Sequence, residues 1–271
     1  MTMHTVQCRS CGGTVAHPAG AQVPRCLFCG RDALEHTESP GVEPPDSFLP
    51  FDLTKEAARK AFRDWSKRRF WAPRSIQRAT LSLNPLFLPA WTWGADLETH
   101  WAALVPARTR SGSRPVTGKD NARIEGVLVP SSPTLAAAEL EAISPFSEER
   151  EQSLGDSLPS VPFEIGTLTR AIAQERGVQQ LRESHGARIA AALGSSKLST
   201  SALVHNTDGR PLLLPIWIGA YVHGEKSYRV VINGQSGSLH GAAPISWWKV
   251  IGALVTGLFF LMLLLVVAAS Q

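Results

Sequence analysis

The longest hydrophobic stretch of the chain lies at its C-terminal end. From Val250 to Ala269, twenty consecutive positions carry no ionisable side chain, and only two uncharged residues follow. A helix of this length rises by about 30 Å, the thickness of a bilayer core, and globular helices seldom lack a polar face for so long. Trp247, Trp248 and Lys249 come just before it, as residues at the membrane interface do. The pattern predicts a tail-anchored, single-pass protein of the cell (inner) membrane, with its N-terminal part in the cytoplasm.

Before this stretch, hydrophobic positions follow helical and strand-like patterns. Ala58, Phe62 and Trp65 recur at near-helical spacing and predict a helix over residues 54–71. The strand-like segment PLFLPAW at 85–91 returns as PLLLPIW at 211–217. Each copy follows a helix-like segment and precedes a polar turn with another strand-like run. We therefore expect two related α+β modules, each a helix followed by an antiparallel meander.

All four cysteines lie within the first 29 residues, in the pairs Cys8-Arg-Ser-Cys11 and Cys26-Leu-Phe-Cys29. Four thiolates at this spacing match the tetrahedral preference of Zn²⁺, and so short a segment needs a metal to fold. Two disulfides conflict with a cytoplasmic location, and a redox site needs one such pair in a βαβ context. We expect a zinc ribbon with one Zn²⁺, which is structural because four sulfurs leave no open position.

These patterns divide the chain into several parts, with a proline-rich linker behind the cysteines. The expected fold class is multidomain: a small N-terminal zinc ribbon, an α+β body and a single C-terminal transmembrane helix. The expected domains are the ribbon at 1–35, the linker at 36–50, the first α+β module at 51–105, a connecting region at 106–165, the second module at 166–246 and the membrane anchor at 247–269.

Charge is uneven, although the formal net charge is only +4. Residues 55–78 hold nine basic side chains against two acids, while 139–164 hold seven acids and one arginine. The basic helix has three interpretations: it binds anionic lipid headgroups, it binds nucleic acid phosphates, or it is a solvated face paired with the acidic segment. The candidates for an anionic surface are Lys55, Arg59, Lys60, Arg63, Lys67, Arg68 and Arg69.

Catalytic chemistry has no support in the sequence. Residues 112–119 resemble a phosphate-binding loop, but the spacing is one residue too long, and Asp120 stands where a hydroxyl binds magnesium. The eight histidines occur singly, without a metal-binding pair on a helix. We expect no enzymatic activity and infer no small-molecule substrate.

Together these segments resemble a family of bacterial zinc-ribbon membrane proteins often labelled "primosomal protein N′ (replication factor Y), helicase". Motifs along nearly the whole chain carry the resemblance: the four cysteines, Pro50-Phe51, Trp65, Phe70 to Pro73, Pro89-Ala-Trp91, Leu213-Leu-Pro215-Ile-Trp217, Tyr221, Lys226-Ser-Tyr228, Asn233-Gly-Gln-Ser-Gly237 and Pro244-Ile-Ser-Trp-Trp-Lys249. The helicase label has no basis here, because a Walker loop and a DExx box are both absent from the sequence.

The resemblance implies a scaffold, because some relatives are similar to membrane anchors encoded beside phage-shock-protein-A-like and flotillin-like (SPFH) proteins. The expected function is an adaptor that recruits such protein partners to the lipid bilayer. The alternative is a membrane-tethered nucleic-acid-binding protein that uses the ribbon and the basic helix at 55–78. The two hypotheses differ in the salt dependence that each predicts for binding.

Overall fold

The computed structural model describes residues 3–10, 12–18, 25–28, 31–36, 43–107, 112–132, 134–154, 161–195 and 197–269. Within these ranges the strands are β1 (Met3–Cys8), β2 (Thr14–Pro18), β3 (Leu34–His36), β4 (Ser47–Phe48), β5 (Leu81–Pro106), β6 (Ser113–Pro130), β7 (Gln152–Ser153), β8 (Phe163–Glu164), β9 (Lys197–His223), β10 (Lys226–Asn233) and β11 (Leu239–Gly241). The helices are α1 (Lys55–Arg68), the 3-10 helix η1 (Arg74–Arg78), α2 (Ala137–Ile143), α3 (Arg170–Leu193) and α4 (Trp247–Ala269).

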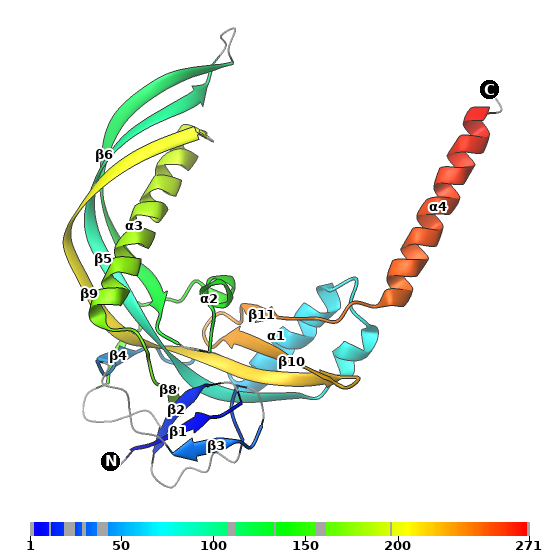
Figure 1. Ribbon diagram of the computed structural model, residues 1–271, viewed down its shortest axis with the longest axis horizontal. Helices are drawn as coiled ribbons and strands as arrows, with labels where there is room; N and C mark the ends of the chain where they lie inside the picture. Colours follow the sequence, from blue (N-terminus) through cyan, green and yellow to red (C-terminus); the bar gives the residue numbers. More distant parts are fainter. Residues whose placement is uncertain are drawn as a thin grey trace.

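Two very long strands, β5 and β9, form the axis of the molecule. They pair antiparallel from Leu81 opposite Tyr221 to Leu104 opposite Lys197, with one irregularity near Gly94. β6 extends the sheet beside the second half of β5, and β10 extends it beside the end of β9. The sheet curves strongly, with α3 inside the curve at one end and α1 near the other (Figure 1).

Prolines sit inside these central strands without breaking the ladder. Pro85, Pro89, Pro211 and Pro215 share one parity of the β5–β9 register. Backbone groups at this parity bond away from the partner strand: the Phe87 amide donates to the Pro162 carbonyl (2.9 Å), and the Pro89 carbonyl accepts from the Ser131 amide (3.0 Å). A proline there removes no hydrogen bond between β5 and β9.

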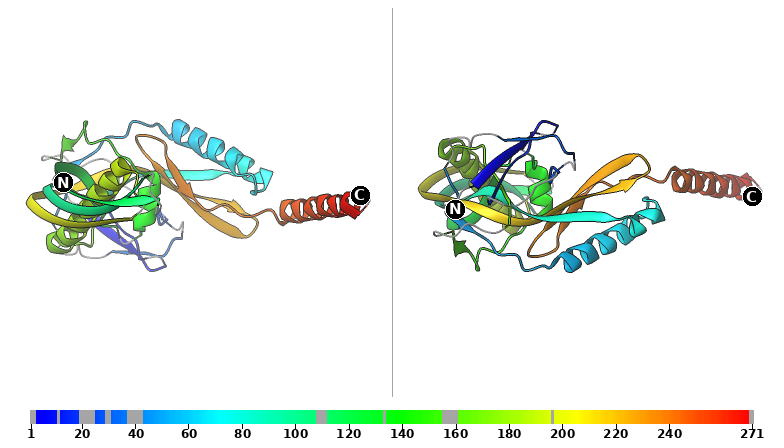
Figure 2. Two further views of the ribbon diagram at one scale, coloured as in Figure 1. Left: turned by 90° about the horizontal axis from the view of Figure 1, so that it is seen from above. Right: turned by 90° about the horizontal axis from the view of Figure 1, so that it is seen from below.

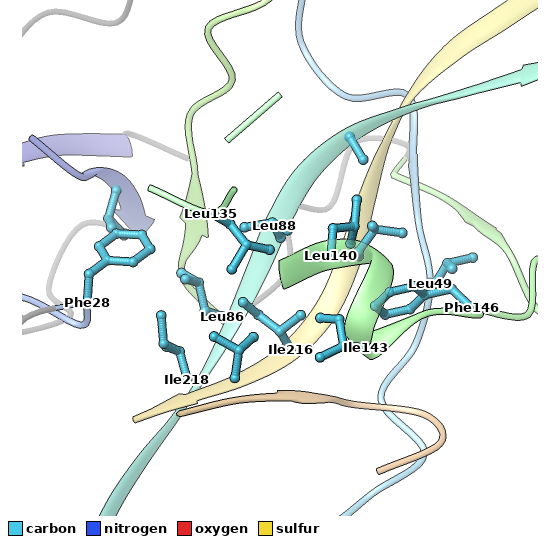
Figure 3. Close-up of a cluster of buried hydrophobic side chains, with 14 of the residues drawn as sticks. Phe28, Leu49, Leu86, Leu88, Leu135, Leu140, Ile143, Phe146, Ile216 and Ile218 are labelled. Carbon is cyan, nitrogen blue, oxygen red and sulfur yellow. The ribbon is translucent and has the colours of Figure 1, made fainter. Parts of the chain in front are cut away.

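The predicted separation into a zinc ribbon and an α+β body is wrong. In the described residues, β1, β2 and β3 belong to the same mixed eleven-stranded sheet as β5 and β9, because β8 pairs with both β2 and β5. The segment also shares a core with the body: Cys8, Cys26 and Phe28 are buried in one hydrophobic cluster with β5 and β9 side chains such as Leu86. Figure 3 shows Phe28 and Leu86 in this cluster. A shared sheet and core leave no independent N-terminal domain.

The two expected modules are not separate units either. The segments 85–91 and 211–217 pair directly with each other, with Pro85 opposite Trp217 and Trp91 opposite Pro211. The repeated motif therefore marks two adjacent strands of one ladder. The expectation of a helix before each copy agrees with α1 and α3, and Thr54 caps α1 by accepting from the Ala57 amide (3.3 Å).

The predicted transmembrane anchor is wrong as well, and with it the predicted location in the inner membrane. None of the helices in the described part of the chain combines the length and hydropathy that crossing a membrane requires.

Candidate functional site

The N-terminus of α4 is fixed to the turn between α1 and η1. The Lys249 ammonium donates to the carbonyls of Phe70 (2.8 Å) and Ala72 (2.6 Å), and the Ser246 amide donates to the Trp71 carbonyl (2.7 Å). The ammonium also lies 5.7 Å from the centre of the Phe70 ring. These bonds set the direction in which α4 leaves the body, and they give the predicted interface residue Lys249 a structural role.

Beyond this turn α4 projects away from the rest of the molecule, as all three ribbon views show (Figures 1 and 2). A Cβ added at Gly252 or Gly257 would meet no described atom within 4 Å. Trp247 and Trp248, also predicted to lie at an interface, are 72% and 85% exposed. We define the α4 surface as the exposed apolar residues of the helix and its base: Phe70, Trp71, Ile245, Trp247, Trp248, Ile251, Leu254, Val255, Leu258, Phe260 and Met262.

The basic residues predicted as an anionic surface lie on and just after α1. All except Lys55, which is partly buried, are exposed, because the other side of α1 packs Ala58 and Phe62 into the core. Lys60 and Lys67 both form ion pairs with Asp64, at 3.1 and 3.5 Å. Those two bonds also lower the pKa of the Asp64 carboxyl. Among the described residues, the arginines of α1 have no acidic partner within ion-pair distance.

The acidic segment at 139–164 pairs elsewhere. Glu139 binds Arg229 (2.8 Å), and Glu151 and Glu148 both bind Arg210 (2.5 and 3.2 Å). The Arg210 guanidinium lowers the pKa of the Glu151 carboxyl. Within the described part of the chain, these acids neutralise arginines of β9 and β10. The interpretation that they pair with α1 is therefore not supported.

The predicted zinc ligands fall partly outside the structure. Cys8 and Cys26 are buried, whereas Cys11 and Cys29 lie outside the described residues. Among the residues that are described, no three His, Cys, Asp or Glu side chains gather into a metal-binding group, so the predicted metal-binding character of a zinc ribbon is wrong for this part of the chain. The set of four thiolates with one Zn²⁺ is not tested and stays a prediction.

One polar network was missed by the sequence reasoning. His185 of α3 is 1% exposed, and its Nδ1 lies 2.9 Å from the Thr99 hydroxyl while its Nε2 lies 2.7 Å from the Asp120 carboxylate. Thr99 is also buried, so no substrate reaches its hydroxyl, and the network joins α3 to β5 and β6. The three residues are far apart in sequence, and no local motif indicates them.

Comparisons with known proteins show a distant similarity only. No model of a protein family matches the chain, and no solved structure matches it. The chain is 23% identical over 232 residues to the uncharacterized protein YdjG of Bacillus subtilis (strain 168), which covers 76% of this chain. The match spans 65% of the length of YdjG, just under two thirds of that relative.

Proposed function

We propose that this protein is an adaptor that binds a protein partner through the α4 surface. The observation that carries the proposal is the exposure of the helix: Leu254, Val255 and Leu258 are each more than 60% exposed. Contiguous exposed apolar patches larger than about 600 Å² mark interaction sites, and tryptophans are over-represented where binding energy concentrates. The bonds at the base of α4 hold the direction in which this surface leaves the body.

The chemistry around the base supports a partner of a particular kind. A long apolar helix is covered most completely by another apolar helix, which packs its side chains into the grooves of the first. The arginines of α1 have no acidic partner among the described residues, and Arg68, in the last turn of α1, comes two residues before Phe70 of the base. The partner is therefore an apolar helix with an acidic segment at the end that meets α1.

Photo-crosslinking in cells tests this proposal. A benzoylphenylalanine at Leu254, which is 62% exposed on α4, is compared with the same residue at Leu203, which is 54% exposed on β9. We expect one protein partner at Leu254 and none at Leu203. The same partner at both positions, or none at Leu254, contradicts the proposal. A crosslink to a second copy of this chain alone replaces the adaptor with self-assembly.

A second candidate function is nucleic-acid binding, favoured by the arginines of α1, which have no acidic partner among the described residues. Its test is the affinity for a labelled oligonucleotide as the salt concentration rises. If binding uses about five phosphate contacts, the affinity falls by a factor of roughly 10² or more between 50 and 200 mM salt, and Kd rises accordingly. The substitutions Arg59→Ser and Arg63→Ser reduce the slope if α1 is the contact. A flat response to salt removes this candidate and leaves the adaptor.

A further inference from the structure

The two copies of the repeated motif are related by a local two-fold. In the β5–β9 ladder Leu88 lies opposite Leu214, and a two-fold axis through this pair exchanges the two strands. Each residue of the first copy is thereby related to the residue at the same place in the second copy. Side chains alternate between the faces of a strand. Leu86, Leu88 and Ile216 therefore enter the main core on one face (Figure 3), while the prolines and tryptophans of both copies share the other.

On the shared face, the Trp217 end is filled by an aromatic ring from elsewhere in the chain. The centre of the Phe51 ring lies 5.4 Å from that of Trp217 and 5.3 Å from that of Phe87. The Trp217 indole N–H donates to the Leu53 carbonyl (3.2 Å). A Cβ at Gly234 would come within 2.7 Å of the Phe51 ring, so this glycine makes room for the ring.

At the other end, the counterparts of these residues line a cavity. The two-fold relates Trp217 to Trp91 and Phe87 to Leu213, and both Trp91 and Leu213 line a cavity of about 260 Å³. Pro89 and Pro211, the counterparts of Pro215 and Pro85, line it too. Where one end holds the Phe51 ring, the other therefore holds a space bounded by equivalent aromatic, proline and aliphatic surfaces.

The charged groups in the cavity wall are carboxyls. Glu43 is held by Arg170, whose guanidinium donates to both carboxylate oxygens and lies 4.9 Å from the centre of the Trp91 ring. Glu164 is 1% exposed: its Oε1 accepts from the Thr134 hydroxyl (2.5 Å), and its Oε2 has no hydrogen-bond partner among the described residues. Among the described residues that line the cavity, there is no lysine, arginine or histidine. Glu43 is already compensated by Arg170, so the acceptor that the described wall offers to a donor group is the Oε2 atom of Glu164.

We propose that this cavity binds a small aromatic molecule that carries an amine. The ring takes the place between Trp91 and Leu213 that Phe51 takes between Trp217 and Phe87. The amine faces the acidic part of the wall. A volume of about 260 Å³ admits a bicyclic ring with a short side chain, and it excludes larger cofactors.

Calorimetric titration of the full chain with matched probes tests the site. Tryptamine supplies ring and amine, indole-3-acetate supplies the ring with the opposite charge, and butylamine supplies the amine alone. We expect saturable binding of tryptamine, at least tenfold weaker binding of indole-3-acetate, and no binding of butylamine. Equal affinity for the two indoles, or no binding of tryptamine, overturns the proposal. Tighter binding of N-acetyltryptophan amide shows that the site takes a peptide side chain instead.

A filling substitution locates the site. Leu168→Trp places an indole in the cavity wall, and Leu203→Trp places the same ring on an exposed part of β9. We expect the first variant to lose tryptamine affinity at least tenfold and the second to keep it. If Leu168→Trp does not fold, crosslinking of a diazirine derivative of tryptamine to the unsubstituted protein gives the answer. Labelled peptides that contain lining residues, from 43–45, 89–91, 163–168 or 211–213, support the site, and labelling confined to other segments contradicts it.

Discussion

The two ends of the β5–β9 ladder carry matching strand residues but are closed in different ways. At the Trp217 end the segment before α1 inserts Phe51 against the indole. At the Trp91 end the crossing segment contributes Pro44 and Pro45, whose compact rings leave a cavity of about 260 Å³. The same strand motif therefore produces a sealed surface or an open one, and the difference lies in the segment that crosses it.

The largest effect is expected where the sealed end is held together. Asn233 is fully buried; its amide donates to the carbonyls of Ile143 (2.8 Å) and Pro145 (3.0 Å), and its carbonyl accepts from the Gln235 amide (2.7 Å). Asn233→Leu leaves all of these groups without a partner, and buried unpaired polar groups cost about 1–3 kcal/mol each. We expect the free energy of unfolding to fall by about 3–5 kcal/mol in urea titrations.

The control for this substitution is Asn121→Leu, on the exposed strand β6. This variant makes the same replacement of an amide side chain, but at an exposed position. It should change the unfolding free energy by less than about 0.5 kcal/mol. Equal losses in both variants would mean that the hydrogen bonds of Asn233 do not hold the turn beside Gly234.

Phe51→Ala should convert the sealed end into a copy of the open one. Removal of a core phenylalanine costs about 3–5 kcal/mol, and Phe51 is only partly buried, so we expect a loss of about 2–3 kcal/mol. The new space lies between Trp217 and Phe87. Indole should bind there and raise the Tm of the variant more than that of the original protein, as measured by differential scanning fluorimetry.

Phe70→Ala is the matched control, because Phe70 is 70% exposed at the base of α4. It should change the Tm little and give no extra response to indole. If indole stabilises the Phe70→Ala and Phe51→Ala variants equally, the ring of Phe51 does not fill a site equivalent to the cavity at Trp91.

The open end also contains a carboxyl that makes folding depend on pH. Burial raises the pKa of Glu164 from its ordinary value of 4.5 to about 7, and the nearby hydroxyls of Ser132 and Thr134 together with the charge of Arg229 oppose the rise. Between these two pH values the folded protein binds more protons than the unfolded chain, so stability falls as the pH rises. The full loss is on the order of 3 kcal/mol and is complete above pH 7.

Glu164→Gln removes this titration. We expect the variant to resemble the original protein near pH 4.5 and to be more stable than it at pH 8, measured as urea midpoints across the range. Glu43, whose carboxyl pairs with Arg170, serves as the comparison. This residue is exposed and lacks the burial that produces the effect at Glu164. Parallel curves for Glu164→Gln and the original protein would contradict the assignment.

Local sequence patterns predicted single elements better than their assembly. The spacing of Ala58, Phe62 and Trp65 predicted α1, and the repeated PLxLPxW segment predicted two strands. Proximity in sequence suggested that each copy belongs to its own module, whereas the register pairs them with each other. Pairing over such separations depends on complementary faces of both strands, which neither pattern contains alone.

The candidate sites were predictable only where they depend on composition. Trp247 and Trp248 were predicted to lie at a membrane interface; both side chains are exposed, but none of the helices in the described residues is suited to cross a membrane. The cavity at Trp91 needs Pro44, Leu168 and Leu213 from three distant segments, and its buried Glu164 has no sequence context that distinguishes it from a solvated acid. Tertiary packing, not local pattern, creates both features.

The smallest effect is expected in the network that holds α3 over the open end. Asp120→Ala removes the partner of His185 Nε2, now at 2.7 Å, but Asp120 is half exposed and water replaces part of the bond. We expect a loss of about 1 kcal/mol in urea titrations and faster hydrogen exchange of α3 amides than of α1 amides. Glu125→Ala, at an exposed position of the same strand, should change neither quantity measurably. Equal acceleration in α1 and α3 would show that the network stabilises the whole sheet and not the helix that covers the Trp91 end.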